Sequence, residues 1–304
     1  MRERLLVVVA GPTGVGKTRA AIELARACDA ELVGADSVQV YRGFDIGSSK
    51  PTAAELSGVP HHLIDIREPE DTLDAASYAT LADRTIADIH GRGRLPIVVG
   101  GTGLWLRALL SGLVDTPKVD AALRARLEAE WDAQGPAAMH HRLAAVDPES
   151  AQRIHPNDKL RVVRALEVHV QTGQPLGAAR TAHALGQPRY HALTFVVDLA
   201  QAHHHERVRT RTRQMLEQGF RAEVESLLAR HGPDVRPMQA VGYKQMLAHV
   251  REGVGSAETE TAIVRATLTY ARRQRTWWRS DRTVQARLSP DALQADALAA
   301  IARA

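Results

Sequence analysis

The segment Gly11-Pro-Thr-Gly-Val-Gly-Lys17-Thr18 has the residues and the spacing of a phosphate-binding loop. It follows an apolar run at residues 5–9 and precedes a helix-like stretch at 19–27, the context that makes this pattern specific. The glycines let the loop curl so that backbone N–H groups point at an anion, Lys17 adds a charge, and the Thr18 hydroxyl can hold Mg²⁺. The alternative is an ordinary glycine turn. We predict that two or more linked phosphates bind to Gly11, Pro12, Thr13, Gly14, Val15, Gly16, Lys17 and Thr18.

Polar residues also follow two later apolar runs. Asp36 follows the run at 31–35, and Thr102 follows the run at 96–99. Because the carboxyl ends of parallel strands meet at one edge of a sheet, we expect both side chains beside the phosphate loop. Asp36 is then a candidate catalytic carboxylate, and Thr102 offers a hydroxyl to the same crevice. Each also has a simpler interpretation, Asp36 as a helix N-cap or turn residue and Thr102 as the N-cap of a strand-to-helix turn.

Two further segments could reach this crevice. The polar, turn-prone segment 45–51 is either a lid over the phosphates or a solvated loop. Arg207 and Arg211 are four residues apart, so on a helix they share one face. That face is either a solvated surface or a phosphate contact.

The apolar runs define the elements that must position these residues. Runs at 5–10, 31–35, 62–66, 96–99 and 192–199 indicate buried strands, with helical stretches between the first four. This alternation predicts an α/β fold, a P-loop NTPase-like parallel sheet flanked by helices. Residues 115–190 are rich in Ala, Arg and Glu at helical spacing, broken at Gly135-Pro136, and predict an all-helical insertion. Residues 1–114 and 191–304 would form the catalytic core, which is helical after Leu199.

The composition is that of an ordinary globular protein. Of the 304 residues, 44% are hydrophobic and 24% are charged, which is enough for a large core and a subdomain. A net charge of +4 permits a nucleic-acid partner without requiring one. No run approaches the roughly 20 apolar residues that span a bilayer, and the N-terminal run is too short for a signal peptide. The single Cys28 fits a reducing compartment, so we expect a cytoplasmic protein without a membrane partner.

Taken in order, the motifs resemble those of the tRNA dimethylallyltransferases, also called tRNA isopentenyltransferases. The resemblance runs from about Leu5 to Trp278. It rests on the phosphate loop, Ala35-Asp-Ser-Val-Gln-Val-Tyr41, Asp45-Ile-Gly-Ser-Ser-Lys-Pro51, Pro60-His-His-Leu-Ile-Asp65, Gly100-Gly-Thr102, His155-Pro-Asn-Asp158, Arg164-Ala-Leu-Glu167, Val241-Gly-Tyr-Lys-Gln245 and Arg273-Gln-Arg-Thr-Trp277. Two positions depart from the family pattern, since Ser48-Ser49 replaces the more frequent Thr-Ala and Trp105 replaces a common Tyr.

The resemblance implies that the enzyme transfers a dimethylallyl group from dimethylallyl diphosphate to the exocyclic N6 amine of a tRNA adenosine, 3′-adjacent to the anticodon. We expect the protein to be a monomer. This amine is a poor nucleophile because its lone pair is delocalised, and by similarity Asp36 is the general base. The loop amides, Lys17 and Mg²⁺ on Thr18 would meet the charge of the departing diphosphate. No ATP would be hydrolysed at this ATP-binding type of loop. By the same similarity, Thr102 and Arg211 complete the catalytic set, with Thr102 near the amine or the diphosphate and Arg211 as a diphosphate or phosphate contact.

The resemblance also implies contacts with the tRNA anticodon stem-loop, from which the target base must leave its stack. The implied residues are Asp36, Ser37, Val38, Gln39, Arg124, Lys159, Leu160, Arg161, Val162, Val163, Gly242, Tyr243 and Gln245. In the helix expected after Asn157 or Asp158, residues 160, 163, 166 and 170 form an apolar stripe. Near the C-terminus, arginines from Arg265 to Arg282 accompany Trp277 and Trp278, which either stack on bases or pack into the core.

Three other functions are compatible with parts of the sequence. Adenylate isopentenyltransferases use the same loop and base on a free nucleotide, but the helical insertion and the arginine-rich C-terminal segment favour a macromolecular acceptor. The phosphate loop alone would suit a small-molecule kinase, which removes the γ-phosphate of ATP. A nucleotide-dependent switch or a non-catalytic RNA-binding protein would keep its role after Asp36→Ala, whereas a transferase would lose most of its turnover.

Overall fold

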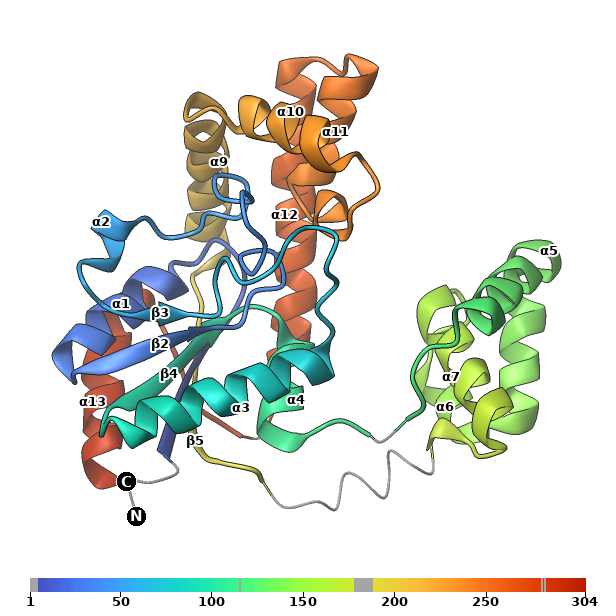
Figure 1. The fold of residues 1–304 in the computed structure, drawn as a ribbon, viewed down its shortest axis with the longest axis horizontal. Helices are drawn as coiled ribbons and strands as arrows, with labels where there is room; N and C mark the ends of the chain where they lie inside the picture. The colour runs from blue at the N-terminus through green and yellow to red at the C-terminus, as the bar shows by residue number, and fades with distance from the viewer. Residues whose placement is uncertain (1–4, 115, 178–187, 280, 282) are drawn as a thin grey trace. The chain divides into compact units, whose positions relative to one another are not determined.

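The computed structural model describes residues 5–114, 116–177, 188–279, 281 and 283–304 (Figure 1). The chain divides into two compact units. The first combines Met1–Leu110 with Arg189–Ala304, and the second is Ser111–Pro188. The phosphate loop and Asp36 both belong to the first unit.

A six-stranded sheet forms the centre of the first unit. Its strands are β1 (Leu5–Ala10), β2 (Ala30–Gly34), β3 (His61–His62), β4 (Leu95–Gly100), β5 (His191–Val197) and β6 (Val284–Leu288). Their order is β3-β2-β4-β1-β5-β6, and every neighbouring pair is parallel. All six residues of β1 are buried, because this strand lies inside the sheet and both faces are covered. The predicted fold class, a parallel α/β sheet flanked by helices, is confirmed.

Helices cover the two faces of the sheet. The helices of this unit are α1 (Lys17–Ala27), α2 (Ala53–Leu56), α3 (Ala75–Gly91), α4 (Gly103–Ser111), α9 (Gln201–Glu217), α10 (Phe220–His231), η2 (Arg236–Gln239), α11 (Tyr243–Glu252), α12 (Ser256–Arg279), η3 (Pro290–Ala292) and α13 (Leu293–Arg303). Leu6 and Val8 enter one apolar cluster and Val7 and Val9 another, because successive strand residues point to opposite faces. Side chains of α3, α4 and α9–α12 belong to the first cluster, and those of α1 and α13 to the second. Figure 1 shows α9 to α12 gathered at one end of the sheet.

The second unit is helical in its described part. Its first helix, α5 (Ala121–Val146), bends at Gly135, which has a φ of 82° and precedes Pro136, at the predicted break. After α6 (Pro148–Arg153), α7 (Lys159–Thr172) is capped by Asp158, whose side chain accepts a hydrogen bond from the backbone amide of Arg161 in the first turn. The core of this unit contains Leu127, Trp131, Met139, Leu143, Ala151, Ile154, Val162, Val163, Ala165 and Leu166. Across the residues that the structure describes, no helix has the length and hydropathy needed to cross a bilayer.

Two predicted element assignments in the first unit are wrong. The chain is not helical throughout after Leu199, because β6 pairs with β5 at the edge of the sheet. This strand alternates half-buried and exposed residues and so lacks the apolar run that marks the others. The strand predicted at 62–66 is only His61–His62, since Leu63 and Asp65 have positive φ values of 60° and 54°, which are incompatible with an extended strand.

The apolar stripe predicted on α7 is wrong at both ends. Leu160 is 75% exposed and Val170 is 44% exposed, whereas Val163 and Leu166 are buried. The buried arc of the helix instead includes Val162, because that side packs in the same core as α5.

Candidate active site

Two adjoining cavities lie beside the phosphate loop and Asp36. The larger, of about 1120 Å³, is lined by the phosphate loop, the start of α1, residues 48–52 and one face of α9. The smaller, of about 270 Å³, is lined by side chains from α9, residues 239–243 and α12. Both cavities are lined by Thr13, Asp36, Ser48, Arg211 and Met215. Asp36 and Arg211 therefore lie where the two cavities meet.

The phosphate loop has the backbone shape that its glycines were predicted to allow. Gly11 and Gly16 have φ values of 141° and 100°, which other residues adopt only with strain. At Gly11 a Cβ atom would also lie 2.1 Å from the carbonyl oxygen of Val197, because the loop passes the end of β5. Lys17 begins α1, and its Nζ donates a hydrogen bond to the carbonyl of Pro12 at 2.6 Å. The ammonium group is thus folded back against the loop.

The two arginines of α9 share one helix face, as their four-residue spacing predicted, and that face lies against the phosphate loop. A Cβ atom at Gly16 would lie 2.8 Å from Nη2 of Arg207, and one at Gly14 would lie 4.0 Å from Nη1 of Arg211. Arg207 and Arg211 also both line the larger cavity. With Lys17, three cationic side chains surround the space in which linked phosphates were predicted to bind.

The charges at this site influence one another. Burial lowers the pKa of Lys17 to about 8, an effect that the charge of Asp36 opposes and that of Arg211 reinforces. Burial also lowers the pKa of Arg211, again opposed by Asp36 and reinforced by Arg207. Lys17 is therefore mainly protonated at neutral pH and loses its proton above pH 8.

Asp36 lies two residues beyond the end of β2, where it forms a turn and also lines both cavities. Its Oδ1 accepts hydrogen bonds from the backbone amides of Val38 at 2.9 Å and Gln39 at 3.3 Å, which forms a turn. The same side chain lines both cavities. Thr102 lies beside this turn, because its Oγ1 accepts a hydrogen bond from the amide of Ser37 at 3.1 Å. The structure thus brings together the two residues that were predicted to lie at this sheet edge.

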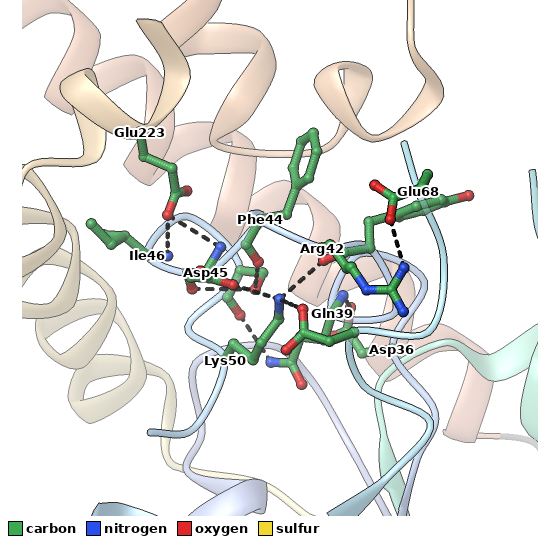
Figure 2. Close-up of polar contacts among 12 residues, drawn as sticks. Asp36, Gln39, Arg42, Phe44, Asp45, Ile46, Lys50, Glu68 and Glu223 are labelled. Carbon is green, nitrogen blue, oxygen red and sulfur yellow. Dashed lines mark hydrogen bonds and ion pairs between the residues drawn. The ribbon is translucent and has the colours of Figure 1, made fainter. Parts of the chain in front are cut away.

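Glu223 fastens the segment 45–47 to α10, and sequence reasoning missed it. Its carboxylate accepts hydrogen bonds from the amides of Asp45, Ile46 and Gly47 at 3.1, 2.6 and 3.2 Å, and from the Tyr243 hydroxyl at 2.7 Å. Figure 2 shows this side chain pointing from its helix toward the loop. The amides lie 176 to 178 residues away along the chain, so no local pattern marks this glutamate.

Two more side chains hold the same loop (Figure 2). Nζ of Lys50 pairs with Asp45 and Asp65, each at 2.5 Å. Nε2 of Gln39 donates to the carbonyls of residues 48 and 49 at 3.0 and 3.2 Å. The segment that was predicted to be a lid or a solvated loop is therefore a wall of the larger cavity, held from several sides.

We expect Glu223→Gln to lower the free energy of unfolding by about 1–3 kcal/mol, because an amide nitrogen cannot accept the hydrogen bonds of the second carboxylate oxygen. Chemical denaturation would measure this change. The matched control is Glu225→Gln on the same helix, since Glu225 pairs only with exposed Arg221 at the surface in the described contacts. The control is expected to shift stability by less than about 0.5 kcal/mol. Equal shifts in the two variants would contradict the anchoring role of Glu223.

Several residues of the first unit were predicted to contact tRNA. Some of them form internal hydrogen bonds, and others line the smaller cavity. The amide of Gln39 is bonded to the loop at 48–49. Oε1 of Gln245 accepts a hydrogen bond from the Gly242 amide at 2.8 Å and caps α11. Four others line the smaller cavity: Ser37, Val38, Gly242 and Tyr243.

Residues of the second unit were also predicted to contact tRNA. Some of them lie on the surface of this unit, and others lie in its core. Exposed or half-exposed positions of the first turn of α7 are Lys159, Leu160 and Arg161. Val162 and Val163 are core residues of this unit. Arg124 pairs with the buried carboxylate of Glu167 at 2.5 Å. Of these five α7 residues, a partner could therefore reach only those of the first turn, Lys159, Leu160 and Arg161.

In the C-terminal arginine and tryptophan segment, the tryptophans pack toward the interior, whereas Arg265, Arg272, Arg273 and Arg279 are exposed. Trp278 is 2% exposed and packs in the apolar cluster with α3 and α10, and Trp277 packs against that cluster. Arg275 forms an ion pair with Asp198 at 2.7 Å. Arg282 lies outside the described residues. For Trp278 the structure supports core packing, the second of the two interpretations.

Thr18 fits the chemistry of a magnesium ligand. Its side chain lines the larger cavity directly after Lys17. Among the described residues, no group of three or more His, Cys, Asp or Glu could hold a metal ion. Magnesium in phosphate sites commonly takes one or two protein oxygens and completes its shell with phosphates and water. A single hydroxyl beside a phosphate loop therefore suits an ion that is shared with a bound diphosphate.

The chain matches known proteins over most of its length. Residues 39–281 match the family model for IPP transferase. The chain is 48% identical to a tRNA dimethylallyltransferase of Sorangium cellulosum, over 90% of this chain and 87% of that protein. It is 43% identical to the tRNA dimethylallyltransferase of Geobacter sulfurreducens, over 92% of this chain and 90% of that protein.

Solved structures agree with these sequence matches. The full-length tRNA isopentenylpyrophosphate transferase of Bacillus halodurans superposes with a TM-score of 0.73 at 36% identity, covering 98% of this chain and 96% of that one. A eukaryotic dimethylallyltransferase described as acting on tRNA superposes with a TM-score of 0.76 at 28% identity, covering 90% of this chain and 70% of that one. The protein is therefore a transferase and belongs to the IPP transferase family, whose curated relatives are tRNA dimethylallyltransferases.

Proposed function

We propose that this protein transfers the dimethylallyl group of dimethylallyl diphosphate to the N6 amine of the adenosine 3′-adjacent to the anticodon in tRNA and releases diphosphate. The observation that carries the proposal is the position of Asp36 in the wall shared by two cavities. One cavity has the phosphate loop and the cations that suit a diphosphate. The other has apolar side chains that suit a five-carbon group: Val38, Val208, Met215, Val241 and Ile263.

The proposed reaction is a single displacement at carbon. The adenosine N6 nitrogen attacks C1 of the dimethylallyl group, the bond between C1 and the diphosphate oxygen breaks, and the diphosphate leaves with the electron pair. Asp36 accepts the proton that N6 loses, since its carboxylate is held at the reacting edge by two backbone amides. Lys17, Arg211 and the loop amides stabilise the charge of the leaving group. Mg²⁺ held by Thr18 and the diphosphate would neutralise further charge.

The acceptor in this proposal is a tRNA anticodon stem-loop. An exocyclic amine inside a stacked loop is out of reach, so the base has to turn out of the stack toward Asp36. Thr102 supports this reaction by holding the Ser37 amide and thereby the turn that carries Asp36. In the second unit we assign backbone contacts to the first turn of α7, where Arg161 is exposed. We propose that the protein acts as a cytoplasmic monomer.

The test is transfer of label from carbon-labelled dimethylallyl diphosphate, with Mg²⁺, into unmodified tRNA and, in parallel, into AMP. We expect label in tRNA and none in AMP. Label in AMP alone would assign the protein to free-nucleotide prenylation. Label in neither, together with loss of the γ-phosphate from ATP, would favour a kinase.

A further inference from the structure

Gln274 of α12 joins two loops that are far apart in the sequence. Its Oε1 accepts a hydrogen bond from the backbone amide of Thr13 at 2.8 Å, and its Nε2 donates one to the carbonyl of Gly101 at 2.8 Å. The side chain is only 6% exposed. One carboxamide thus connects the phosphate loop with the turn that leads to Thr102.

The chemistry of these partners requires a carboxamide. A backbone N–H can only donate and a backbone carbonyl can only accept, so the orientation of the Gln274 amide is fixed by its neighbours. The fit is also tight, because a Cβ atom at Gly101 would lie 2.4 Å from Nε2 of Gln274. An apolar side chain of the same length would leave the Thr13 amide without this partner.

The carbonyl oxygen of Thr13 is also held, by a side chain of α9. Nε2 of His204, a side chain with no exposed surface, lies 2.8 Å from this oxygen. Arg275 donates to Nδ1 of His204 at 3.0 Å and is itself bonded to both carboxylate oxygens of Asp198. Because the guanidinium group is only a donor, Nδ1 must accept, and Nε2 carries the hydrogen that bonds to Thr13. Both backbone polar groups of Thr13 are therefore fixed by α9 and α12.

Helix α12 also reaches the smaller cavity. Thr267 and Tyr270 line the smaller cavity, and Gln274 follows Tyr270 by four residues on the same helix face. One rigid element therefore contacts both the cavity assigned to the five-carbon group and the phosphate loop assigned to the diphosphate. In Figure 1, α12 runs as one long helix from the α9–α11 group down to the sheet.

We propose that Gln274 is a positioning residue that fixes the phosphate loop at Thr13 and the Gly101 turn in the arrangement that binds the diphosphate donor. This role rests on the proposed function, in which that loop holds the leaving group. It predicts that loss of the carboxamide weakens binding of a diphosphate even though Gln274 does not line either cavity.

The test compares Gln274→Met with the wild-type protein, using inorganic diphosphate with Mg²⁺ as the probe. Calorimetry should show that Kd rises about tenfold or more, the size expected for losing a buried hydrogen bond that orders the site. Hydrogen exchange at the Thr13 amide should become at least about tenfold faster, because its acceptor is gone. The control is Thr276→Ala, since Thr276 is exposed and bonds to a carbonyl of its own helix.

A second variant separates a positioning role from a general packing role. Gln274→Glu keeps an oxygen for the Thr13 amide and loses the donor to Gly101, so Thr13 should remain protected while the amides of residues 101–103 exchange faster. Unchanged diphosphate affinity and unchanged Thr13 protection in Gln274→Met would overturn the inference. Lack of label transfer by the wild-type protein would instead contradict the proposed function, and the diphosphate binding comparison would still stand.

Discussion

Replacing Asp36 by asparagine should reduce kcat for label transfer to tRNA by about 10²–10⁴-fold, the range that a positioned general base contributes. Asparagine has nearly the same shape and keeps an oxygen for the Val38 and Gln39 amides, so the turn that Asp36 forms should persist. What is lost is the basic oxygen that accepts the N6 proton. Single-turnover kinetics with labelled dimethylallyl diphosphate would measure the effect on the chemical step.

The control for Asp36→Asn is a second carboxylate-to-amide change at the larger cavity. Glu55 lines this cavity but is exposed, and its carboxylate accepts hydrogen bonds from Thr52 as part of a helix cap. Glu55→Gln should therefore leave kcat within about threefold of the wild-type value, as expected for a cap whose loss affects stability by about 1 kcal/mol. Diphosphate affinity should stay close to the wild-type value in both variants. A kcat in Asp36→Asn equal to that of Glu55→Gln would exclude Asp36 as the base.

Replacing Lys17 by methionine should lower kcat/KM for dimethylallyl diphosphate by about 10²–10³-fold, the usual effect of removing one donor that stabilises a developing anion. Methionine fills a similar volume but carries neither the charge nor the hydrogen bond to Pro12. Arg19→Met is the matched control, because Arg19 is a largely exposed cation at the same cavity and pairs with Glu23. Steady-state kinetics of both variants would show whether charge at position 17 is specifically required.

The pH dependence of the wild-type enzyme gives an independent test of Lys17. Its pKa is lowered to about 8, chiefly by burial, so the side chain is charged below pH 8 and neutral above it. The charged form favours an anionic diphosphate, and kcat/KM for the donor should therefore fall as pH rises through about 8. The fall should be absent in Lys17→Met. A wild-type profile that stays level from pH 7 to 9 would contradict this role.

The sequence by itself determined the local parts of the site. A run of β-branched and leucine residues, a glycine-rich turn and a helical stretch are consecutive, so β1, the phosphate loop and α1 follow from near-neighbour preferences. The position of Asp36 at a strand end follows in the same way, because parallel strands align their carboxyl ends. The kink at Gly135 was equally predictable, since glycine followed by proline interrupts a helix.

Only the tertiary structure decided the features that depend on distant partners. The edge strand β6 has no apolar run and exists because the backbone of β5 offers it a parallel partner. The strand at His61–His62 ends early because Leu63 and Asp65 take positive φ values. Their residue types do not predict this backbone conformation. On α7, the choice between Leu160 and Val162 as the buried residue was made by packing within the second unit.

The same distinction holds within the site. From the sequence, Lys17 was predicted from its motif and Asp36 from its strand end, and Arg211 from its spacing to Arg207 and the family resemblance. It did not identify Glu223 as the anchor of the 45–47 loop or Gln274 as the link between two loops, since their partners are up to 178 and 261 residues away. Residues that touch a substrate are limited by the chemistry of the reaction and so leave a local pattern. Residues that position them are limited only by the folded geometry, in which many side-chain types and chain positions could meet the same backbone groups.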